Sequence, residues 1–364
     1  MKKPLLISAL ALVVSSAFAS GGAVYTLSNQ VAGNQILSFD RTDDGKLTPG
    51  PAINTGGLGT GSGLGNQNAI VLSNDNRFLF AVNAGSNNVS VFKFRGNTPE
   101  LIDLEPALGV RPISITQHGK WVYVLNAGDA THAAGIQGFW LNNSGDLEPL
   151  AGASGALSTA QPGPAQIQFN TAGDSVVVTE KGTNLVDVFS LDKHGYPTSA
   201  SYNPANGITP FGFDFDNKGR LFVAEAFGGG ANASALSSYK FGVGNDLQVV
   251  TGSAPTTETA ACWAVVTKDG KFVYTTNAGS GTVSGYRIAN EGSVSLLNGD
   301  GVTASTGAGS APIDIANSLN GRFIYVLGGG AHSIFTYRVL SNGQLEAIDV
   351  DGGLPVGTNG LAAR

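Results

Sequence analysis

A short strand pattern recurs seven times along this chain. Each copy is a run of β-branched and aromatic residues that ends near Gly or Asn, and successive copies are roughly 50 residues apart. The copies are VYTLSN ending at Asn29, FLFAVNAG at Gly85, WVYVLNAG at Gly128, VVVTEKG at Gly182, LFVAEAFG at Gly228, VYTTNAG at Gly279 and IYVLGGG at Gly330. Repeats of this length are typical of propeller blades, so this feature restricts the fold more than any other.

A third strand follows each copy and carries an aromatic residue at one fixed place. We expect these rings to be core, packed between neighbouring sheets. They are Phe39, Phe92, Phe139, Phe189, Tyr239, Tyr286 and Tyr337. Turns such as Asn143-Ser144-Gly145 then lead to a more polar fourth strand. Each unit is therefore predicted to be a four-stranded antiparallel sheet, and the chain an all-β, seven-bladed β-propeller.

The first unit lacks its first strand, because the chain from Ala23 begins directly with a second strand. The C-terminal residues 357–363 have the character of residues 66–71, which open the second unit. We therefore expect the C-terminal strand to complete the first blade and close the ring. Closure would also replace disulfides, since Cys262 is the only cysteine and is expected to be a small buried hydrophobe.

The N-terminus has the pattern of a cleaved signal peptide. Lys2 and Lys3 precede an apolar run from Leu5 to Val14, and Ala17-Phe18-Ala19 fits a cleavage site. This predicts a signal peptide at residues 1–19, a propeller at 20–364, and a periplasmic or secreted bacterial protein. A retained anchor is the alternative, but the apolar run is too short for a spanning helix, so no membrane insertion is expected after cleavage.

The balance of charge argues against nucleic acid as a partner. The net charge is −6, and removal of the two lysines would make the mature chain more acidic. The Gly-rich segment 56–65 lacks the Gly-Lys-Ser/Thr of a phosphate-binding loop and is predicted to join two blades. The expected partner is a small-molecule ligand; the sequence does not predict an oligomeric state.

Antiparallel strand order places two sets of loops around one mouth of the channel. These are the loops before each first strand and the loops after each second strand, and together they form a natural concave site. Candidates to contact a ligand are Asn68, Asn83, Asp129, His132, Gln166, Phe211, Glu225, Trp263 and His332. Lys181 lies in the same loops, whereas the opposite face, with His118 in its turns, shows no comparable signal.

Two carboxylates stand out at the ends of the second strands. Glu180 and Glu225 replace the Asn or Gly of other repeats and lie on adjacent predicted blades. They could act as acid and base, or bind a divalent cation at the mouth. Equally, each could accept hydrogen bonds from a neighbouring blade. No His cluster has metal-ligand spacing, so no metal site and no cofactor are assigned.

The repeat P-x-x-I-x-x-x-x-x-G-[RK]-[FW]-[VIL]-Y-V-x-N resembles the lactonase-family seven-bladed propellers. That family includes propeller-type 6-phosphogluconolactonases and 3-carboxymuconate lactonising enzymes. Its Gly-Pro-Arg-His motif, followed by Glu, corresponds to 163–166 and Glu180; Ala165 and Gln166 replace the Arg and His. Asn126-Ala127-Gly128-Asp129 is similar to the family's Gly-x-Asp loop, whereas Ala278 stands where the family has Arg after Asn277.

The resemblance implies one of two functions. The first is hydrolysis of a small uncharged lactone, with Glu180 as general base and Arg111, Asn126 or Asn277 stabilising the oxyanion. The second is a non-catalytic propeller that binds a small molecule, a cation or a protein at its mouth. The retained Glu180 favours the first, and the replaced Arg and His favour the second.

Overall fold

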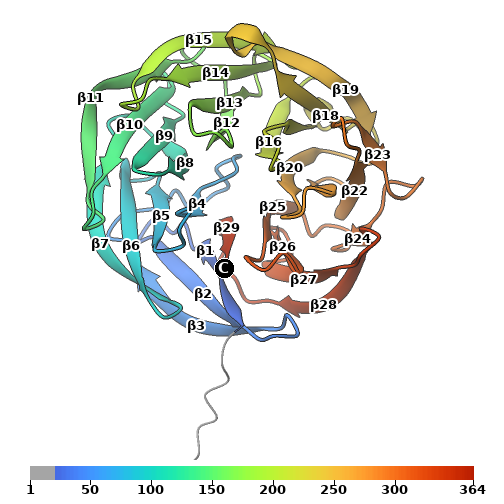
Figure 1. Ribbon diagram of the computed structural model, residues 1–364. Coiled ribbons are helices and arrows are strands. Elements are labelled where there is room, and N and C mark those ends of the chain that lie inside the picture. The colour runs from blue at the N-terminus through green and yellow to red at the C-terminus, as the bar shows by residue number, and fades with distance from the viewer. Residues whose placement is uncertain (1–20) are drawn as a thin grey trace, which may run out of the picture.

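Seven sheets are arranged as a ring around a central channel in the computed structural model of the chain (Figure 1). The structure describes residues 21–364, so the predicted signal peptide at 1–19 lies outside the described residues. Within the described part, no helix has the length and apolar character needed to cross a membrane. The prediction of a seven-bladed, all-β propeller is confirmed.

Each sheet has four strands in simple order from the channel outward, and we number the blades along the chain. Blades 1 to 4 consist of β29 (Asn359–Ala363), β1 (Gly22–Leu27), β2 (Gln35–Arg41), β3 (Leu47–Asn54); β4 (Ile70–Leu72), β5 (Phe78–Asn83), β6 (Asn88–Arg95), β7 (Thr98–Pro106); β8 (Pro112–His118), β9 (Trp121–Asn126), β10 (Gly135–Leu141), β11 (Leu147–Ala156); and β12 (Pro164–Phe169), β13 (Ser175–Glu180), β14 (Leu185–Leu191), β15 (Pro197–Pro204).

Blades 5 to 7 follow the same plan. They consist of β16 (Pro210–Phe215), β17 (Leu221–Glu225), β18 (Ala235–Phe241), β19 (Leu247–Pro255); β20 (Ala261–Val266), β21 (Phe272–Asn277), β22 (Thr282–Ile288), β23 (Val294–Leu296); and β25 (Pro312–Asn317), β26 (Phe323–Gly328), β27 (Ser333–Val339), β28 (Leu345–Asp351). In blade 6 the short β24 (Ala304–Ser305) also pairs with β22. Two 3-10 turns, Phe227–Gly229 and Val243–Asn245, flank β18.

The C-terminal strand closes the first blade, as predicted. β29 lies against β1 in an antiparallel register that pairs Val24 with Ala363 and Tyr25 with Ala362. The backbones of Ala23 and Arg364 exchange hydrogen bonds of 3.1 and 2.8 Å. Without β29, the inner edge of β1 would be unpaired, so the two ends of the chain hold the ring shut.

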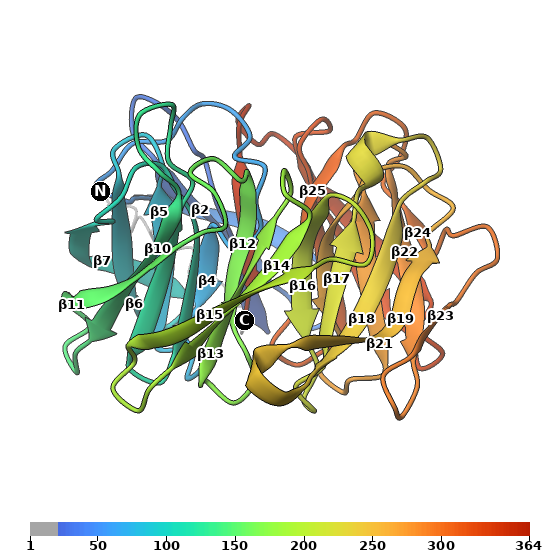
Figure 2. The same cartoon turned by 90° about the horizontal axis from the view of Figure 1, so that it is seen from above.

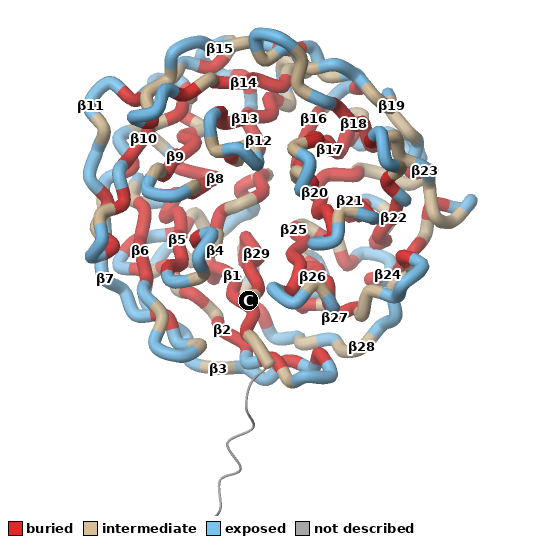
Figure 3. Tube along the Cα trace, in the orientation of Figure 1, coloured by how far each residue is buried: buried red, intermediate tan, exposed pale blue. Residues whose placement is uncertain are grey.

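Burial follows the distance of each strand from the channel (Figure 3). The second strands β5, β21 and β26 are buried along their whole length, whereas the outer strand β7 is largely exposed. Second strands pack between two neighbouring blades, which explains their continuous runs of apolar residues in the sequence. All seven third-strand aromatic residues are at most 5% exposed, which confirms that they are core.

The turn glycines fit the side chains of the preceding blade. Gly145 has a φ of +104°, and a Cβ there would overlap the ring of Phe78 in blade 2. Gly343 (φ +90°) meets Phe272 in the same way, and its carbonyl accepts a 2.7 Å hydrogen bond from the hydroxyl of Tyr274. These turns therefore need Gly for two reasons: the left-handed backbone conformation and the close contact between blades.

The segment 64–69, which leads into β4, lies in the centre of the ring and contacts blade 6; we call it the plug (Figure 1). The amide of Gln67 crosses to blade 6, where it donates to the carbonyl of Ala264 (2.8 Å) and accepts from its N–H (3.1 Å). The indole N–H of Trp263 donates to the carbonyl of Asn66 at 2.6 Å. A Cβ at residue 212 would collide with the Gln67 amide, so Gly212 leaves the space that the plug occupies.

Candidate functional site

The loops before the first strands and after the second strands lie on one face of the ring, because consecutive strands run antiparallel between the two faces (Figure 2). We call this the loop face, and the opposite one, which carries the tight turns, the turn face. The plug lies between two cavities. Leu64 lines one of about 420 Å³ on the loop face, and Gln67 and Asn68 line one of about 530 Å³ that extends to the turn face.

Five predicted site residues occupy the same position, the last residue of a second strand, and all are buried. They are Asn83, Asn126, Glu180, Glu225 and Asn277, each at most 4% exposed. Glu180 accepts hydrogen bonds from the N–H of Ser158 (2.8 Å) and from the hydroxyls of Ser158 and Thr183. Its carboxylate therefore fastens the loop between blades 3 and 4.

The equivalent residues of other blades have the same role. Asn126 donates to the carbonyl of Ala107 at 3.2 Å, and Glu225 accepts from the N–H of Gly207 at 2.8 Å. Glu180 and Glu225 lie on adjacent blades, as expected, but they share no hydrogen-bond partner. The structure thus supports the alternative in which each carboxylate accepts hydrogen bonds from loops. These five side chains have too little exposed surface for the expected contact with a ligand.

A second buried carboxyl group lies beside Glu180. Asp187 on β14 is fully buried, and the nearby carboxyl group of Glu180 favours the form in which Asp187 keeps its proton. Within residues 21–364, no donor reaches either oxygen of Asp187. Burial, followed by the proximity of Glu180, raises the pKa of Asp187 to about 9. This pair is sealed inside blade 4 and does not face the mouth.

Three further predicted residues belong to the wall of the channel. Gln166 is buried and exchanges hydrogen bonds with the backbone of Phe213 in the next blade, at 2.9 and 2.7 Å. Phe211 and Trp263 are buried and pack with ring centroids 4.9 Å apart. Two others lie apart from this wall: Asn68 is part of the plug, and His332 follows β26 in blade 7.

The loop-face cavity brings together two positively charged side chains, Arg111 and Lys181. Arg111 precedes β8 with a left-handed φ of +58°, a conformation fixed by hydrogen bonds from its N–H to Asn87 and from Ala127 to its carbonyl. Lys181 lies over the ring of Phe211, with Nζ 4.6 Å from the centroid. Burial, together with the smaller effect of Arg111, lowers the pKa of Lys181 to about 8, although Cys262 opposes this shift.

Asp129 also lines this cavity, but it is bound within its own loop. Its Oδ1 accepts from the N–H groups of Thr131 (2.8 Å) and His132 (2.9 Å), and lies 2.8 Å from Nδ1 of His132. These contacts, that of the Thr131 N–H first, hold the pKa of Asp129 well below its usual range. A neutral His132 would carry its proton on Nδ1, toward Asp129, and present Nε2 as an acceptor.

The described residues contain no group of three or more His, Cys, Asp or Glu side chains that could hold a metal ion. Cys262 is free and buried, as expected, and burial raises the pKa of its thiol to about 12. The cavity therefore offers acid–base groups and positive charge from side chains alone.

Of the predicted residues, Arg111 and Asp129 line the cavity, and His132 lies beside Asp129 with an exposed side chain. The prediction missed two important members. Lys181 stands in the predicted loops but directly follows Glu180, which drew attention as the unusual residue. Gln161 donates to the carbonyl oxygens of Asp129 and His132 (2.9 Å to the latter) and orders their loop, a role that its position before Gly163-Pro164 does not reveal.

Comparison with known proteins places this geometry in context. A family model described as lactonase, 7-bladed beta-propeller, matches residues 24–147 and 70–229. A search of curated proteins gives no match. A putative 6-phosphogluconolactonase from Bacteroides fragilis NCTC 9343 is similar in structure, with a TM-score of 0.72, 17% identity and coverage of 96% of this chain and 99% of that one. A periplasmic gluconolactonase from Pseudomonas aeruginosa has a TM-score of 0.71, 15% identity and coverage of 92% and 98%.

Proposed function

Because the chain belongs to the lactonase family of seven-bladed β-propellers, we propose that it hydrolyses a small lactone in the loop-face cavity. The observation that carries this proposal is the pair of cations, Arg111 and Lys181, at one cavity of about 420 Å³. Asp129 lines the same cavity but pairs with His132, and within the described residues it forms no ion pair with either cation. Two cations beside a small cavity suit a reaction in which negative charge develops on the substrate.

Hydrolysis of a lactone develops charge in this way. Water attacks the carbonyl carbon, and the carbonyl oxygen becomes an oxyanion, which Lys181 and Arg111 would stabilise. The water proton passes to Nε2 of His132, held in orientation by Asp129. The ring C–O bond then breaks, the alkoxide receives that proton, and the product is an open hydroxy acid. The substrate itself can be uncharged, because the cations act on charge formed during the reaction.

The assignment of Lys181 can be tested through the pH dependence of hydrolysis. We expect kcat/KM on a panel of five- and six-membered lactones to fall as pH rises above about 8, because Lys181 loses its charge there. Lys181→Met should reduce kcat/KM by about 10²-fold, the usual effect of removing one oxyanion donor. Lys181→Arg should keep activity and move the alkaline limb upward, since a guanidinium stays protonated.

His132→Asn should lower the rate by about 10²-fold or more, whereas Glu180→Gln should leave the mechanism intact if it folds. The opposite pattern, with Glu180→Gln inactive yet as stable as the wild type and Lys181→Met fully active, would reject the assigned roles.

A binding protein without catalysis is the second candidate, and the burial of Glu180 favours it. The same cations would then hold the carboxylate of a hydroxy acid. The two functions are separated by one set of measurements. A protein that hydrolyses no lactone in the panel, but binds gluconate with an affinity that Arg111→Ala and Lys181→Met both weaken, would be the binding protein.

We also propose that the protein is exported. The proposal is supported by the signal-peptide pattern at residues 1–19 and by the similarity to a structure described as periplasmic. N-terminal sequencing of protein from the periplasm or medium of a bacterial host should begin at Ser20. An intact N-terminus on protein retained in the cytoplasm would contradict the proposal.

A further inference from the structure

The larger cavity, of about 530 Å³, lies on the other side of the plug from Arg111 and Lys181. The first strands form its side walls, Gln67 and Asn68 lie at its floor, and turns such as 170–171 and 216–217 form its rim. Its volume is in the range of small-molecule sites. It is separate from the site proposed for hydrolysis.

One residue from each first strand faces this cavity at the same level, and these seven residues divide into two arcs. We assign the level from the register, since each pairs with the equivalent residue of its second strand. The polar arc, from blades 3 to 5, consists of Thr116, Gln168 and Asp214, and the apolar arc, from blades 6, 7, 1 and 2, consists of Val265, Ala316, Ala362 and Val71. One wall can therefore form hydrogen bonds and the opposite wall cannot.

The polar arc is ordered by a chain of hydrogen bonds that leaves capacity for a ligand. Asn68 of the plug donates to Gln168 at 3.3 Å, and Gln168 donates to Asp214 at 2.9 Å. The Asn68 amide also donates to the carbonyl of Ile167 at 3.4 Å. Gln168 keeps a second N–H, and Asn68 keeps its side-chain carbonyl oxygen. The hydroxyl of Thr116 accepts from the N–H of Phe169 at 3.1 Å and can still donate. Donors and acceptors thus alternate along one wall in fixed positions.

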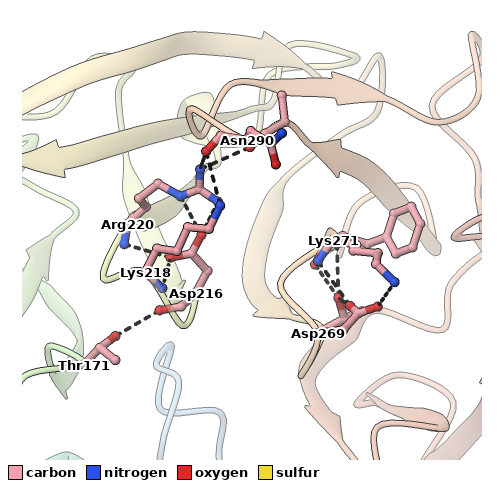
Figure 4. A network of polar contacts seen from close by, with 10 residues as sticks. Thr171, Asp216, Lys218, Arg220, Asp269, Lys271 and Asn290 are labelled. Carbon is pink, nitrogen blue, oxygen red and sulfur yellow. Dashed lines mark hydrogen bonds and ion pairs between the residues drawn. The ribbon is translucent and has the colours of Figure 1, made fainter.

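The acidic groups of the cavity are compensated. Burial raises the pKa of Asp214, which favours its neutral form, although backbone N–H groups and Gln168 oppose this shift. Asp216 at the rim forms an ion pair of 2.5 Å with Arg220, and the same guanidinium donates to Asn290 of blade 6 at 2.7 Å (Figure 4). Thr171 of blade 4 donates to the carbonyl of Asp216 at 3.0 Å, so these contacts also link three blades. Lys268, in the turn after β20, is the one Lys or Arg among the described lining residues, so positive charge is confined to one turn at the rim.

We infer that this cavity is a binding site for a neutral polyhydroxylated ring, such as an uncharged monosaccharide. A sugar ring has hydroxyl groups that both donate and accept, which suits the alternating groups of Thr116, Gln168 and Asn68. It also has patches of C–H groups, which suit the contact with Val265, Ala316 and Val71. The division into two arcs would fix the orientation of the ring, because turning it over would bury hydroxyl groups against apolar side chains.

The test uses the mature full-length protein and three probes of similar size: glucose, gluconate and glucosamine, which are neutral, anionic and cationic. We expect glucose to bind in the millimolar range or tighter by isothermal titration calorimetry and saturation-transfer NMR. At the site that depends on Gln168, glucose should bind better than the two charged probes. Gln168→Met, which removes the hydrogen bonds, and Val265→Phe, which fills the apolar side, should each weaken binding at least about tenfold. Gln35→Met on β2, far from the channel, is the matched control and should bind as the wild type does.

Thermal unfolding of each variant establishes that it is folded before its binding is compared. Preference for glucose, lost in both cavity variants and kept in the control, supports the site. Absence of glucose binding by the wild type, glucose binding that Gln168→Met and Val265→Phe leave unchanged, or gluconate binding that these two variants weaken as much as glucose binding would each overturn the inference. Gluconate binding that Arg111→Ala and Lys181→Met weaken belongs to the loop face, so the variants keep the two sites distinguishable.

Discussion

Removal of residues 354–364 is expected to lower the melting temperature steeply or to prevent folding into a soluble monomer. The deletion takes away β29, in which Leu361, Ala362 and Ala363 are buried, and exposes the whole inner edge of β1. It also removes the 3.0 Å hydrogen bond from Asn359 to Asn66, which ties the closing strand to the plug. Loss of a buried strand should cost several kcal/mol, a large part of the roughly 5–15 kcal/mol that stabilise a typical domain.

The experiment can separate ring closure from the loss of a few terminal contacts. Arg364→Ala keeps β29 and removes only the cation–π contact with Phe94 (4.2 Å) and the bond to Gly96, so its effect should be small. A synthetic peptide of residues 354–364, added to the truncated chain, should restore part of the stability by pairing with β1. A truncated protein that melts like the wild type would show that closure by β29 does not stabilise the ring.

The sequence predicted the blades well because the information that defines them is local and repeated. The second strands can be recognised in the sequence as apolar runs, and the third-strand aromatic residues occupy the same position in every blade. Closure was predictable because residues 357–363 resemble residues 66–71. The plug was not, because the crossing of Gln67 to Ala264 joins residues 197 positions apart. Gly212 leaves the space for the plug, but in the sequence it cannot be distinguished from the other glycines, of which the chain has 52 in all.

The candidate site was harder to predict, and the reason is the position of the side chains rather than their type. Glu180 looked functional because it interrupts a column of Asn, yet the column itself faces the loops between blades. A buried acceptor is needed there to satisfy N–H and O–H groups, and a carboxylate serves as well as an amide. The residue after it, Lys181, points to the cavity. A repeat alignment identifies the unusual residue of a column, but it does not show which column faces the ligand.

Through Asp187 in blade 4, the stability of the protein is expected to change with pH in the direction opposite to that given by most carboxyl groups, whose pKa is lowered by folding. Asp187 has a folded-state pKa of about 9, above the ordinary value of 3.8 expected in the unfolded chain. The folded state therefore holds a proton that the unfolded state releases between these values, and the free energy of unfolding falls as pH rises from about 4 to about 9. Asp187→Asn would put a neutral amide in place of the protonated carboxyl group. The substitution would therefore remove this fall in the free energy of unfolding with rising pH.

We expect Asp187→Asn to stabilise the protein by on the order of 1–3 kcal/mol at pH 8, and to have little effect below about pH 3, where wild-type Asp187 is largely protonated in both states. Urea unfolding of both proteins across this pH range measures the difference. Asp43→Asn, at an exposed turn, is the matched control for the change in net charge. A variant that is less stable than the wild type at every pH would show that Asp187 is not protonated in the fold. If the two proteins differed in free energy of unfolding by the same amount at every pH, the effect would come from packing. Only a group whose pKa differs between the folded and unfolded states can make the stabilisation grow with pH.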